Sequence, residues 1–254
     1  MSRYHYSMNK TESEFTDQLK KLSCPLALTE RQMEQLRAYY ANLIDWNSRM
    51  NLTTVTVEKE VYTKHFLDSY TLFNCVSRET FREGDKLIDV GTGAGFPGIP
   101  LAIAMPEISV TLLDSLGKRV LFLQDTVEKL GLNNVTCIHA RAEDLARNPA
   151  YREKYNYVVS RAVSNLSTLA EYCVPYLKKG GTFVAYKSEK VKEGSELAEG
   201  KKAAALLGAT QCSMQEFTLP DTEYYRILLA FRKTGETPRK YPRKAGIPSK
   251  EPLR

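Results

Sequence analysis

A glycine loop that directly follows an apolar run is the clearest chemical signal in the sequence. A short run containing Asp89 leads into Gly91, Gly93, Gly95 and Gly98. Such a loop lets the backbone turn tightly and approach a ligand at the carboxyl end of a strand, where α/β folds bind nucleotides. We therefore predict an adenosine-containing ligand here, bound in part by Gly91, Gly93 and Gly95.

The residues around this loop discriminate between two classes of ligand. The GxGxxG spacing also occurs in dinucleotide-binding proteins, so the spacing alone is weak evidence. Asp89 precedes the first glycine, where a carboxylate can hold an ammonium group directly or through water but would repel a pyrophosphate. Pro97 and Pro100 remove N–H donors that a pyrophosphate requires. These features favour S-adenosyl-L-methionine over a dinucleotide.

Acidic residues follow the next two apolar runs. Asp114 ends the second run, where a carboxylate can accept both ribose hydroxyls, and Ser115 lies beside it. Glu143 follows the third run, next to Ala142, which we expect to flank the adenine. Any one of these acids could be a solvated loop residue or a helix cap. Their recurrence after successive runs favours a set of cofactor-binding residues.

Basic residues recur in the same expected loops. The chain has 36 lysines and arginines against 30 acidic residues, a net charge of +6 that permits an RNA partner. We assign RNA contacts to Lys118, Arg119, Arg141 and Lys187. Arg161 and Lys187 end apolar runs, where a charged side chain without a function is less expected. We assign both residues to positioning of the reactants at the reacting centre. Arg141 taken alone fits a solvated side chain better.

The apolar runs that carry these residues alternate with helical stretches. We expect strands at 87–90, 110–113, 135–138, 157–159 and 182–186. Alternation of this kind predicts a doubly wound, Rossmann-like α/β sheet of parallel strands, the sheet of S-adenosylmethionine-dependent methyltransferases. Two later runs, 212–219 and 226–231, are separated by a turn and predict an antiparallel hairpin that closes the sheet.

A helical extension precedes the sheet. Thr29 and Gln32 form a capping-box pattern, and apolar residues then recur at helical spacing to about Trp46. A second helical segment, 58–73, has His65 and Asp68 on one side. We interpret these two as a hydrogen-bonded pair that fixes a helical cap over the cofactor, with direct contact to RNA as the alternative.

These patterns divide the chain into three parts. Residues 1–83 form the helical extension, with 1–27 as a frayed or helical leader, and 84–234 form the methyltransferase domain. Residues 235–254 are rich in Pro, Lys and Arg, and we expect a basic tail that lies on the surface or is disordered.

Composition excludes several other classes of protein. No apolar stretch is long enough to span a bilayer, and no signal peptide precedes the first helix, so we expect a cytoplasmic protein without a membrane partner. The five cysteines form no CxxC pair and the three histidines lie near no second ligand cluster. We expect neither disulfides nor a metal site, and a monomer.

Two sequence blocks closely resemble the GidB/RsmG family of guanine-N7 methyltransferases that act on small-subunit ribosomal RNA. They are LIDVGTGAGFPGIP at 87–100 and LLDSLGKR at 112–119; the pieces around Asn47, His65, Arg161 and 238–246 also match. The resemblance covers nearly all of 30–247. It implies cofactor contacts from Gly91, Phe96, Ala142, Glu143 and Arg161, and a guanine of 16S rRNA in the small subunit as the substrate.

The residues after the fourth predicted strand bear on which atom accepts the methyl group. Enzymes that methylate amino groups often carry Asn or Asp followed by Pro-Pro here, whereas this chain has Ser160, Arg161, Ala162 and Val163. Cytosine C5 chemistry needs a cysteine nucleophile, and Cys173 lies in an apolar helical stretch typical of a core. Guanine N7 already has a free lone pair, so a site without an evident base suits it.

Three other functions share some of these features. A small-molecule methyltransferase would keep the glycine loop and Asp114 but would enclose its acceptor in an apolar pocket. An NAD-dependent oxidoreductase would use the same loop for a dinucleotide. A catalytically silent RNA-binding module would retain RNA without transferring a methyl group, which the intact acidic series argues against.

Overall fold

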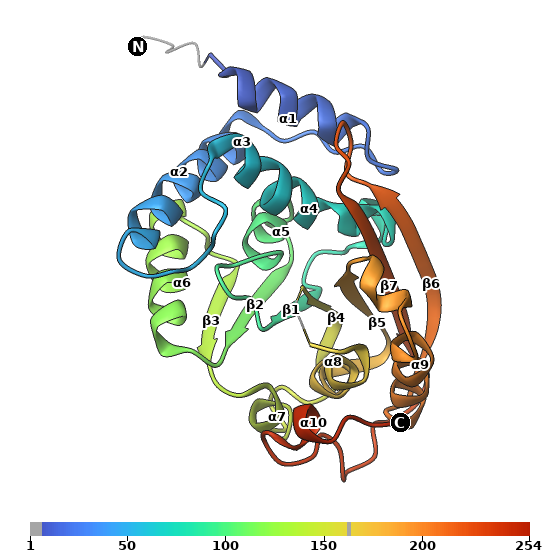
Figure 1. Cartoon of the computed structure of the whole chain (residues 1–254). Helices are drawn as coiled ribbons and strands as arrows, with labels where there is room; N and C mark the ends of the chain where they lie inside the picture. The colour runs from blue at the N-terminus through green and yellow to red at the C-terminus, as the bar shows by residue number, and fades with distance from the viewer. Residues whose placement is uncertain (1–6, 162–163) are drawn as a thin grey trace.

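The computed structural model describes residues 7–161 and 164–254. Within them lies a seven-stranded sheet of order β3-β2-β1-β4-β5-β7-β6 (Figure 1). The strands are β1 (Lys86–Val90), β2 (Ser109–Asp114), β3 (Val135–His139), β4 (Tyr155–Ser160), β5 (Leu177–Lys187), β6 (Ala209–Thr218) and β7 (Tyr225–Lys233). Strands β1 to β5 run parallel, and β7 is antiparallel to both β5 and β6. The predicted doubly wound sheet and its closing hairpin are confirmed.

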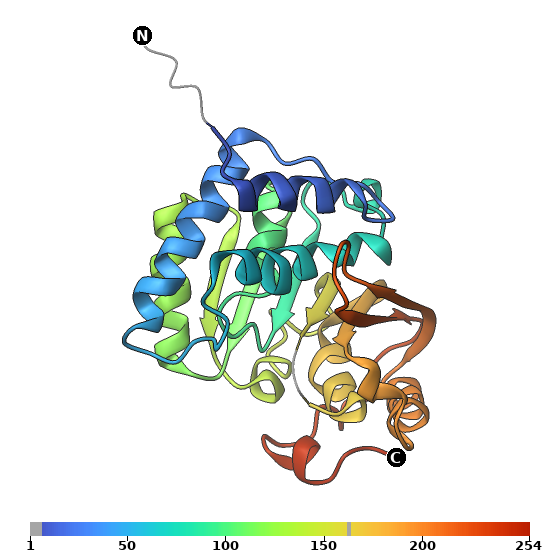
Figure 2. The ribbon, with the colours of Figure 1, turned by 45° about the horizontal axis from the view of Figure 1, so that its top comes forward.

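Helices cover both faces of this sheet (Figures 1 and 2). One face packs against α1 (Lys10–Lys20), α2 (Glu30–Asn47), α4 (Asp68–Tyr70), α5 (Gly98–Ala104) and α6 (Gly117–Leu130). The other face packs against α7 (Ala142–Leu145), α8 (Leu166–Cys173) and α9 (Glu196–Leu206). In the part of the chain that is described, no helix is both long and apolar enough to cross a membrane.

The N-terminal extension is helical and is part of the core. Thr29 caps α2 through the predicted capping box with Gln32. The predicted helix at 58–73 is a continuous run of α3 (Glu58–Val61), the π-helix η1 (Tyr62–Leu67), α4 and the 3₁₀ turn η2 (Thr71–Asn74). Phe15 of α1 is buried against the aromatic rings of this run. The leader therefore contains a packed helix, α1, from Lys10 to Lys20.

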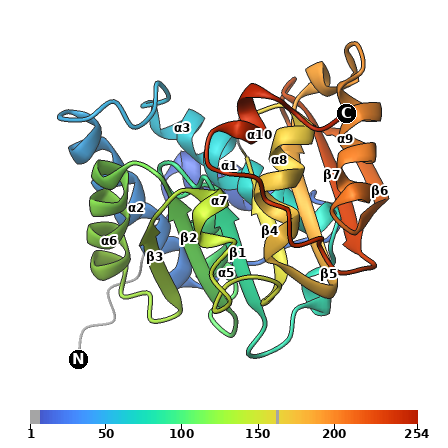
Figure 3. The ribbon, with the colours of Figure 1, turned by 90° about the horizontal axis from the view of Figure 1, so that it is seen from below.

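The expectation of a surface or disordered tail at 235–254 needs correction. Tyr241 and Leu253 are buried in the same cluster as α8, and the short helix α10 (Ile247–Lys250) lies beside α8 (Figure 3). The guanidinium of Arg243 donates to both carboxylate oxygens of the buried Glu171 at 2.8–3.2 Å. Composition alone suggested no core here, because the residue that anchors the segment is a carboxylate on a distant helix.

This anchor generates a test of stability. Replacing Arg243 with Met removes the guanidinium that pairs with the buried Glu171 and leaves it the backbone N–H of residue 243, which should lower the free energy of unfolding by about 3 kcal/mol. Chemical denaturation of wild type and variant measures this change. Lys244→Met, at the exposed neighbouring position, is the matched control and should change stability by less than about 0.5 kcal/mol. Equal stability of the two variants would show that the Glu171 contact does not hold the segment.

Candidate functional site

The glycine loop begins where β1 ends and turns over the side chain of Asp89. Gly91, Gly93 and Gly95 all have positive φ, at 70°, 61° and 96°, a conformation that glycine adopts without strain. One oxygen of Asp89 accepts hydrogen bonds from the Thr92 hydroxyl at 2.7 Å and from the Gly98 N–H at 2.8 Å. The carboxylate therefore fixes both ends of the loop from beneath.

Asp89 also has an unused binding capacity. Its side chain is fully buried, and Oδ1 has no hydrogen-bond partner among the described residues. Burial raises the pKa of this carboxyl to about 7, although the hydrogen bonds from Thr92 and Gly98 and the charge of Arg161 act in the opposite direction. A cation bound over the loop would favour the charged form of Asp89, and the ammonium of S-adenosylmethionine is such a cation.

Asp114 ends β2 and holds the other side of the loop. Oδ2 accepts from the Gly93 N–H and Oδ1 from the Leu116 N–H, both at 2.9 Å. Arg119 approaches Oδ2 at 3.8 Å. Each carboxylate oxygen can accept a second hydrogen bond, so Asp114 retains room for ribose hydroxyls while it stabilises the loop.

A cavity of about 260 Å³, which we call the glycine-loop cavity, lies at this edge of the sheet. Six of the predicted residues line it: Gly91, Asp114, Ser115, Arg141, Ala142 and Glu143. Leu169 and Tyr172 of α8 also line it and were not singled out in the sequence. An added Cβ at Gly91 or Gly93 would meet nothing within 4 Å, so the backbone here faces open space, as an adenosine-containing ligand requires.

Glu143 connects this cavity to the C-terminal segment. Its side chain is buried, and Oε1 accepts from the Gly246 N–H at 3.2 Å, while Arg141 lies 3.7 Å away. Residues 243–246 thereby support one wall of the glycine-loop cavity.

A second cavity, of about 370 Å³, lies under the π-helix and beside the ends of β4 and β5. We call it the Arg161 cavity; its lining is Val55, Lys64, His65, Asp68, Arg161, Tyr186, Lys187, Ser188 and Arg226. The two cavities are linked through Lys187, which lines the second and donates at 2.7 Å to the carbonyl of Ser164, a residue that lines the first.

A chain of hydrogen bonds fixes the groups around the Arg161 cavity. Arg161 donates to Asp68 at 2.8 Å and to Nδ1 of His65 at 3.1 Å. Since a guanidinium only donates, Nδ1 is the acceptor, and Nε2–H of His65 donates to the Thr53 hydroxyl at 2.9 Å. Arg226 donates to the other oxygen of Asp68 at 2.8 Å. The predicted contact between His65 and Asp68 is thus indirect, through Arg161.

The environment of His65 keeps its imidazole neutral. Burial and the adjacent Arg161 lower its pKa to about 3. The ring stacks on Phe96 at 4.4 Å between centroids, and Arg161 lies over the same ring at 5.3 Å. Phe96 is buried in this stack and lines neither cavity, so the structure gives it a packing role, and its contact with cofactor remains a prediction.

Not all predicted basic residues are available for RNA. Lys118 and Arg141 are exposed, Arg119 is partly exposed, and all three can reach solvent. Lys187 differs, because its side chain is 9% exposed and it pairs with Glu196 at 2.8 Å. Binding of an RNA phosphate by Lys187 would require it to leave that carboxylate.

Arg226 is a charged residue of the Arg161 cavity that the sequence analysis missed. It lies next to the start of β7 and shares the buried Asp68 with Arg161, although 158 residues separate Arg226 from Asp68. A single charge at the edge of the apolar run at 227–231 was the available signal. Ala162 and Val163, which entered the argument against amino-group chemistry, lie outside the described residues.

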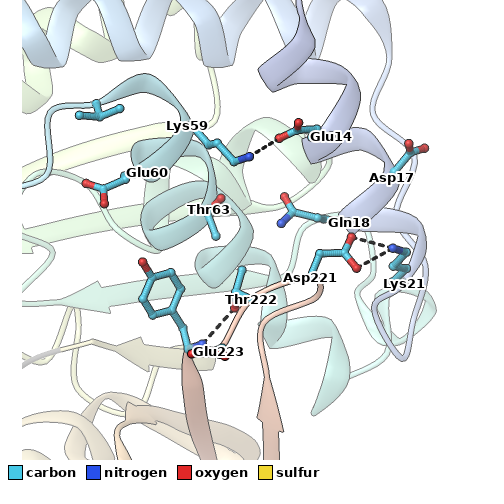
Figure 4. A pocket seen from close by; sticks show the side chains of 12 residues that line it. Glu14, Asp17, Gln18, Lys21, Lys59, Glu60, Thr63, Asp221, Thr222 and Glu223 are labelled. Carbon is cyan, nitrogen blue, oxygen red and sulfur yellow. Dashed lines mark hydrogen bonds and ion pairs between the residues drawn. The ribbon is translucent and has the colours of Figure 1, made fainter.

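A larger cavity, about 840 Å³, lies elsewhere, between α1, α3 and the β6–β7 turn (Figure 4). Lys59 pairs with Glu14 and Lys21 with Asp221 across it. None of the predicted site residues lines it. Size therefore does not identify the site; the convergence of strand ends and the glycine loop does.

Comparisons with known proteins agree with this geometry. The family model described as rRNA small subunit methyltransferase G (GidB) matches residues 32–225. A ribosomal RNA small subunit methyltransferase G from Lactobacillus helveticus is 50% identical over 227 residues, which cover 89% of this chain and 93% of that protein. Its counterpart from Lachnoclostridium phytofermentans is 48% identical over 244 residues, which cover 96% of this chain and 98% of that protein.

Solved structures agree on the fold. A mutant 16S rRNA (adenine(1408)-N(1))-methyltransferase from Catenulisporales acidiphilia, solved with its cosubstrate, superposes with a TM-score of 0.51 at 15% identity, covering 61% of this chain and 88% of that chain. The YcgJ protein of Bacillus subtilis superposes with a TM-score of 0.51 at 13% identity, covering 67% of this chain and all of that chain. At these identities the likeness concerns the fold alone.

The raised pKa of Asp89 predicts a pH-dependent cofactor affinity. Protonation of Asp89 removes the charge that attracts the cofactor ammonium, so affinity for S-adenosylmethionine should be weaker at pH 5.5 than at pH 7, by up to about 16-fold. Calorimetry over this range measures the change. The range lies below the pKa of the cofactor's own amine, so the amine stays protonated throughout. Asp89→Asn should bind more weakly at pH 7, with little change over the range.

Stability supplies the complementary measurement. Because the folded-state pKa of Asp89 exceeds its ordinary value of 3.8, the cofactor-free native state holds the extra proton between about pH 4 and 7. The contribution of Asp89 to stability is therefore lost as pH rises through that window. Asp89→Asn should lessen this loss. Parallel pH profiles of wild type and variant, in both affinity and stability, would contradict the assignment.

Proposed function

The chain belongs to the GidB family of ribosomal RNA methyltransferases, and on that basis we propose that it methylates N7 of a guanine in the 16S rRNA of the small ribosomal subunit. It is an S-adenosylmethionine-dependent rRNA methyltransferase. The observation that carries the proposal is a pair of cavities, one at the glycine loop and one lined by arginines, where parallel strands end and where Lys187 of one lining bonds to Ser164 of the other.

We assign the cofactor to the glycine-loop cavity. The bound cofactor supplies an electrophilic methyl group on a sulfonium. Asp114 would accept the ribose hydroxyls, with Ser115, Ala142 and Glu143 along the adenosine side. Asp89, Gly91, Gly93 and Gly95 would form the methionine side, with Phe96 and Arg161 beyond the loop. The open space at Gly91 and Gly93 supports this orientation. Asp89 is buried beneath the loop and lines neither cavity, so its contact with the cofactor remains a prediction.

The acceptor base then belongs on the side of the Arg161 cavity. Transfer is an in-line displacement, so the protein must hold an acceptor lone pair behind the methyl carbon. Arg161 would position the acceptor and is itself held by His65 and Asp68. Lys187 would position the Ser164 carbonyl between the cavities.

The chemistry of the side chains favours a ring nitrogen that needs no deprotonation. His65 is neutral but already bonded at both ring nitrogens, so it is not free to take a proton. Cys173 is fully buried, and burial raises its pKa well above the ordinary thiol value, which argues against a nucleophile for ring-carbon methylation. Guanine N7 has an available lone pair at neutral pH and matches this site.

Contacts with RNA would come from Lys118, Arg119 and Arg141 around the glycine-loop cavity, and from Lys187 if it leaves Glu196. We further propose that the protein acts in the cytoplasm as a monomer and meets its RNA within the small subunit.

A transfer assay with mapping of the product tests this function. Small subunits from cells that lack the protein should accept one methyl group each, recovered as N7-methylguanine at a single position of 16S rRNA. Asp114→Ala should reduce transfer by at least tenfold, because it removes the ribose acceptor and a bond to the glycine loop. Methyl groups on an amino group or on carbon would refute the N7 assignment, and no transfer to RNA would refute the function.

Among the described residues no side chain is placed as a general base, which predicts a flat pH–rate profile. With saturating cofactor, the single-turnover rate should change less than about twofold between pH 6.5 and 8.5. His65→Gln should slow the reaction by loosening Arg161, yet should leave the shape of the profile unchanged. A limb in the wild-type profile that disappears in this variant would indicate base catalysis.

A further inference from the structure

The Arg161 cavity has an excess of positive charge. Asp68 is the one carboxylate in its lining, and it receives both Arg161 and Arg226. The two lysines of the lining have other partners, since Lys64 pairs with Glu60 and Lys187 with Glu196. Two guanidinium groups therefore share a single carboxylate, which leaves one positive charge uncompensated within this group of residues.

Both guanidinium groups retain donors. Each arginine carries five N–H donors. Arg161 donates to Asp68, to the Lys64 carbonyl and to His65, and Arg226 donates to Asp68 and to the Tyr225 carbonyl. The described contacts thus leave N–H groups on both residues, whose side chains are 22% and 27% exposed.

The position of these donors is fixed before any ligand arrives. Asp68 is buried and receives one arginine on each oxygen, and His65 is held by Thr53 on its far side. The Thr53 hydroxyl in turn accepts a hydrogen bond from the backbone N–H of Val55, and Val55 lines the cavity. Paired, pre-positioned guanidinium groups suit a phosphate, which takes several charge-assisted hydrogen bonds at once.

The reaction itself argues against using these cations on the acceptor ring. Guanine becomes positively charged when N7 is methylated, and N7 must direct its lone pair at the methyl group rather than at an arginine. A permanent cation against the ring would oppose the product charge. The positive charge is better matched to an anionic group beside the ring.

We propose that the Arg161 cavity binds a phosphate group of the RNA that carries the acceptor base, with Arg226 as a second phosphate ligand beside Arg161. The inference rests on the proposed function for the identity of the RNA, but phosphate binding itself can be measured without methyl transfer. Arg226 would thus recognise substrate from a strand that carries no other predicted site residue.

Inorganic phosphate is the direct probe. In an NMR titration, the Nε–H resonances of Arg161 and Arg226 should shift together and saturate, while Arg232, on the same strand but hydrogen-bonded to the Gly180 carbonyl, should not. Arg226→Met should weaken phosphate binding about tenfold or more. Arg226→Lys keeps the charge but loses the planar pair of N–H donors, and it should weaken binding less.

Thermal unfolding checks that each variant folds, and Arg232→Met is the matched control. No saturable shift, or an equal response at Arg232, would overturn the proposal.

The carboxylate of the cofactor is the other possible anion, and a second arm separates it from phosphate. If phosphate is the ligand, saturating S-adenosylmethionine should leave phosphate affinity within about twofold, and Arg226→Met should leave cofactor affinity unchanged. Displacement of phosphate by the cofactor would overturn the assignment to RNA.

A third arm links the cavity to the substrate. For small subunits, Arg226→Met should lower the salt dependence of binding by about 0.7 log units per log salt, the value for one lost phosphate contact on a single strand. Arg232→Met should not. An unchanged slope in Arg226→Met would overturn the RNA assignment. Phosphate binding without methyl transfer by the wild type would instead refute the proposed function and leave the anion site standing.

Discussion

A buried carboxylate needs hydrogen-bond donors or a cationic partner to replace water. In this protein the partners come from distant segments of the chain, so buried carboxylates hold those segments together. Glu12 ties α1 to Arg37 of α2, and Glu171 ties α8 to Arg243 of the C-terminal segment. Asp68 performs the same task for three elements at once, because its arginines follow β4 and begin β7. The extension, the sheet and the C-terminal segment are therefore parts of one structure, and the Arg161 cavity lies where α4, the end of β4 and the start of β7 meet.

Local patterns predicted most of the secondary structure. The capping box at Thr29 and Gln32 correctly marked the start of α2, because its bonds join residues only three apart. The apolar runs correctly marked the strands, since a strand covered on both faces is apolar almost throughout. The packing of the C-terminal segment was not predicted. Arg243 pairs with Glu171, which is 72 residues away in the sequence, and the spacing of nearby residues carries no information about such a contact.

The site was predictable to the extent that it follows strand ends. Asp114 and Glu143 line or border the glycine-loop cavity because parallel strands bring their carboxyl ends to one edge. Sequence spacing could not show that Phe96 would be covered by His65, or that Lys187 would be neutralised by Glu196. Both outcomes depend on which side chain of a neighbouring helix or loop contacts Phe96 or Lys187. Arg226 was missed for the same reason.

The bond between Glu143 and the Gly246 N–H spans 103 residues, and this has a consequence for the newly made chain. Domains fold as their residues leave the ribosome, N-terminal parts first. Glu143 and Glu171 emerge well before Gly246 and Arg243. Both carboxylates therefore lack these partners until the last part of the chain has been synthesised. A nascent chain arrested before residue 243 has the glycine loop but an unfinished cavity wall. Completion of the binding pocket is thereby coupled to the progress of translation.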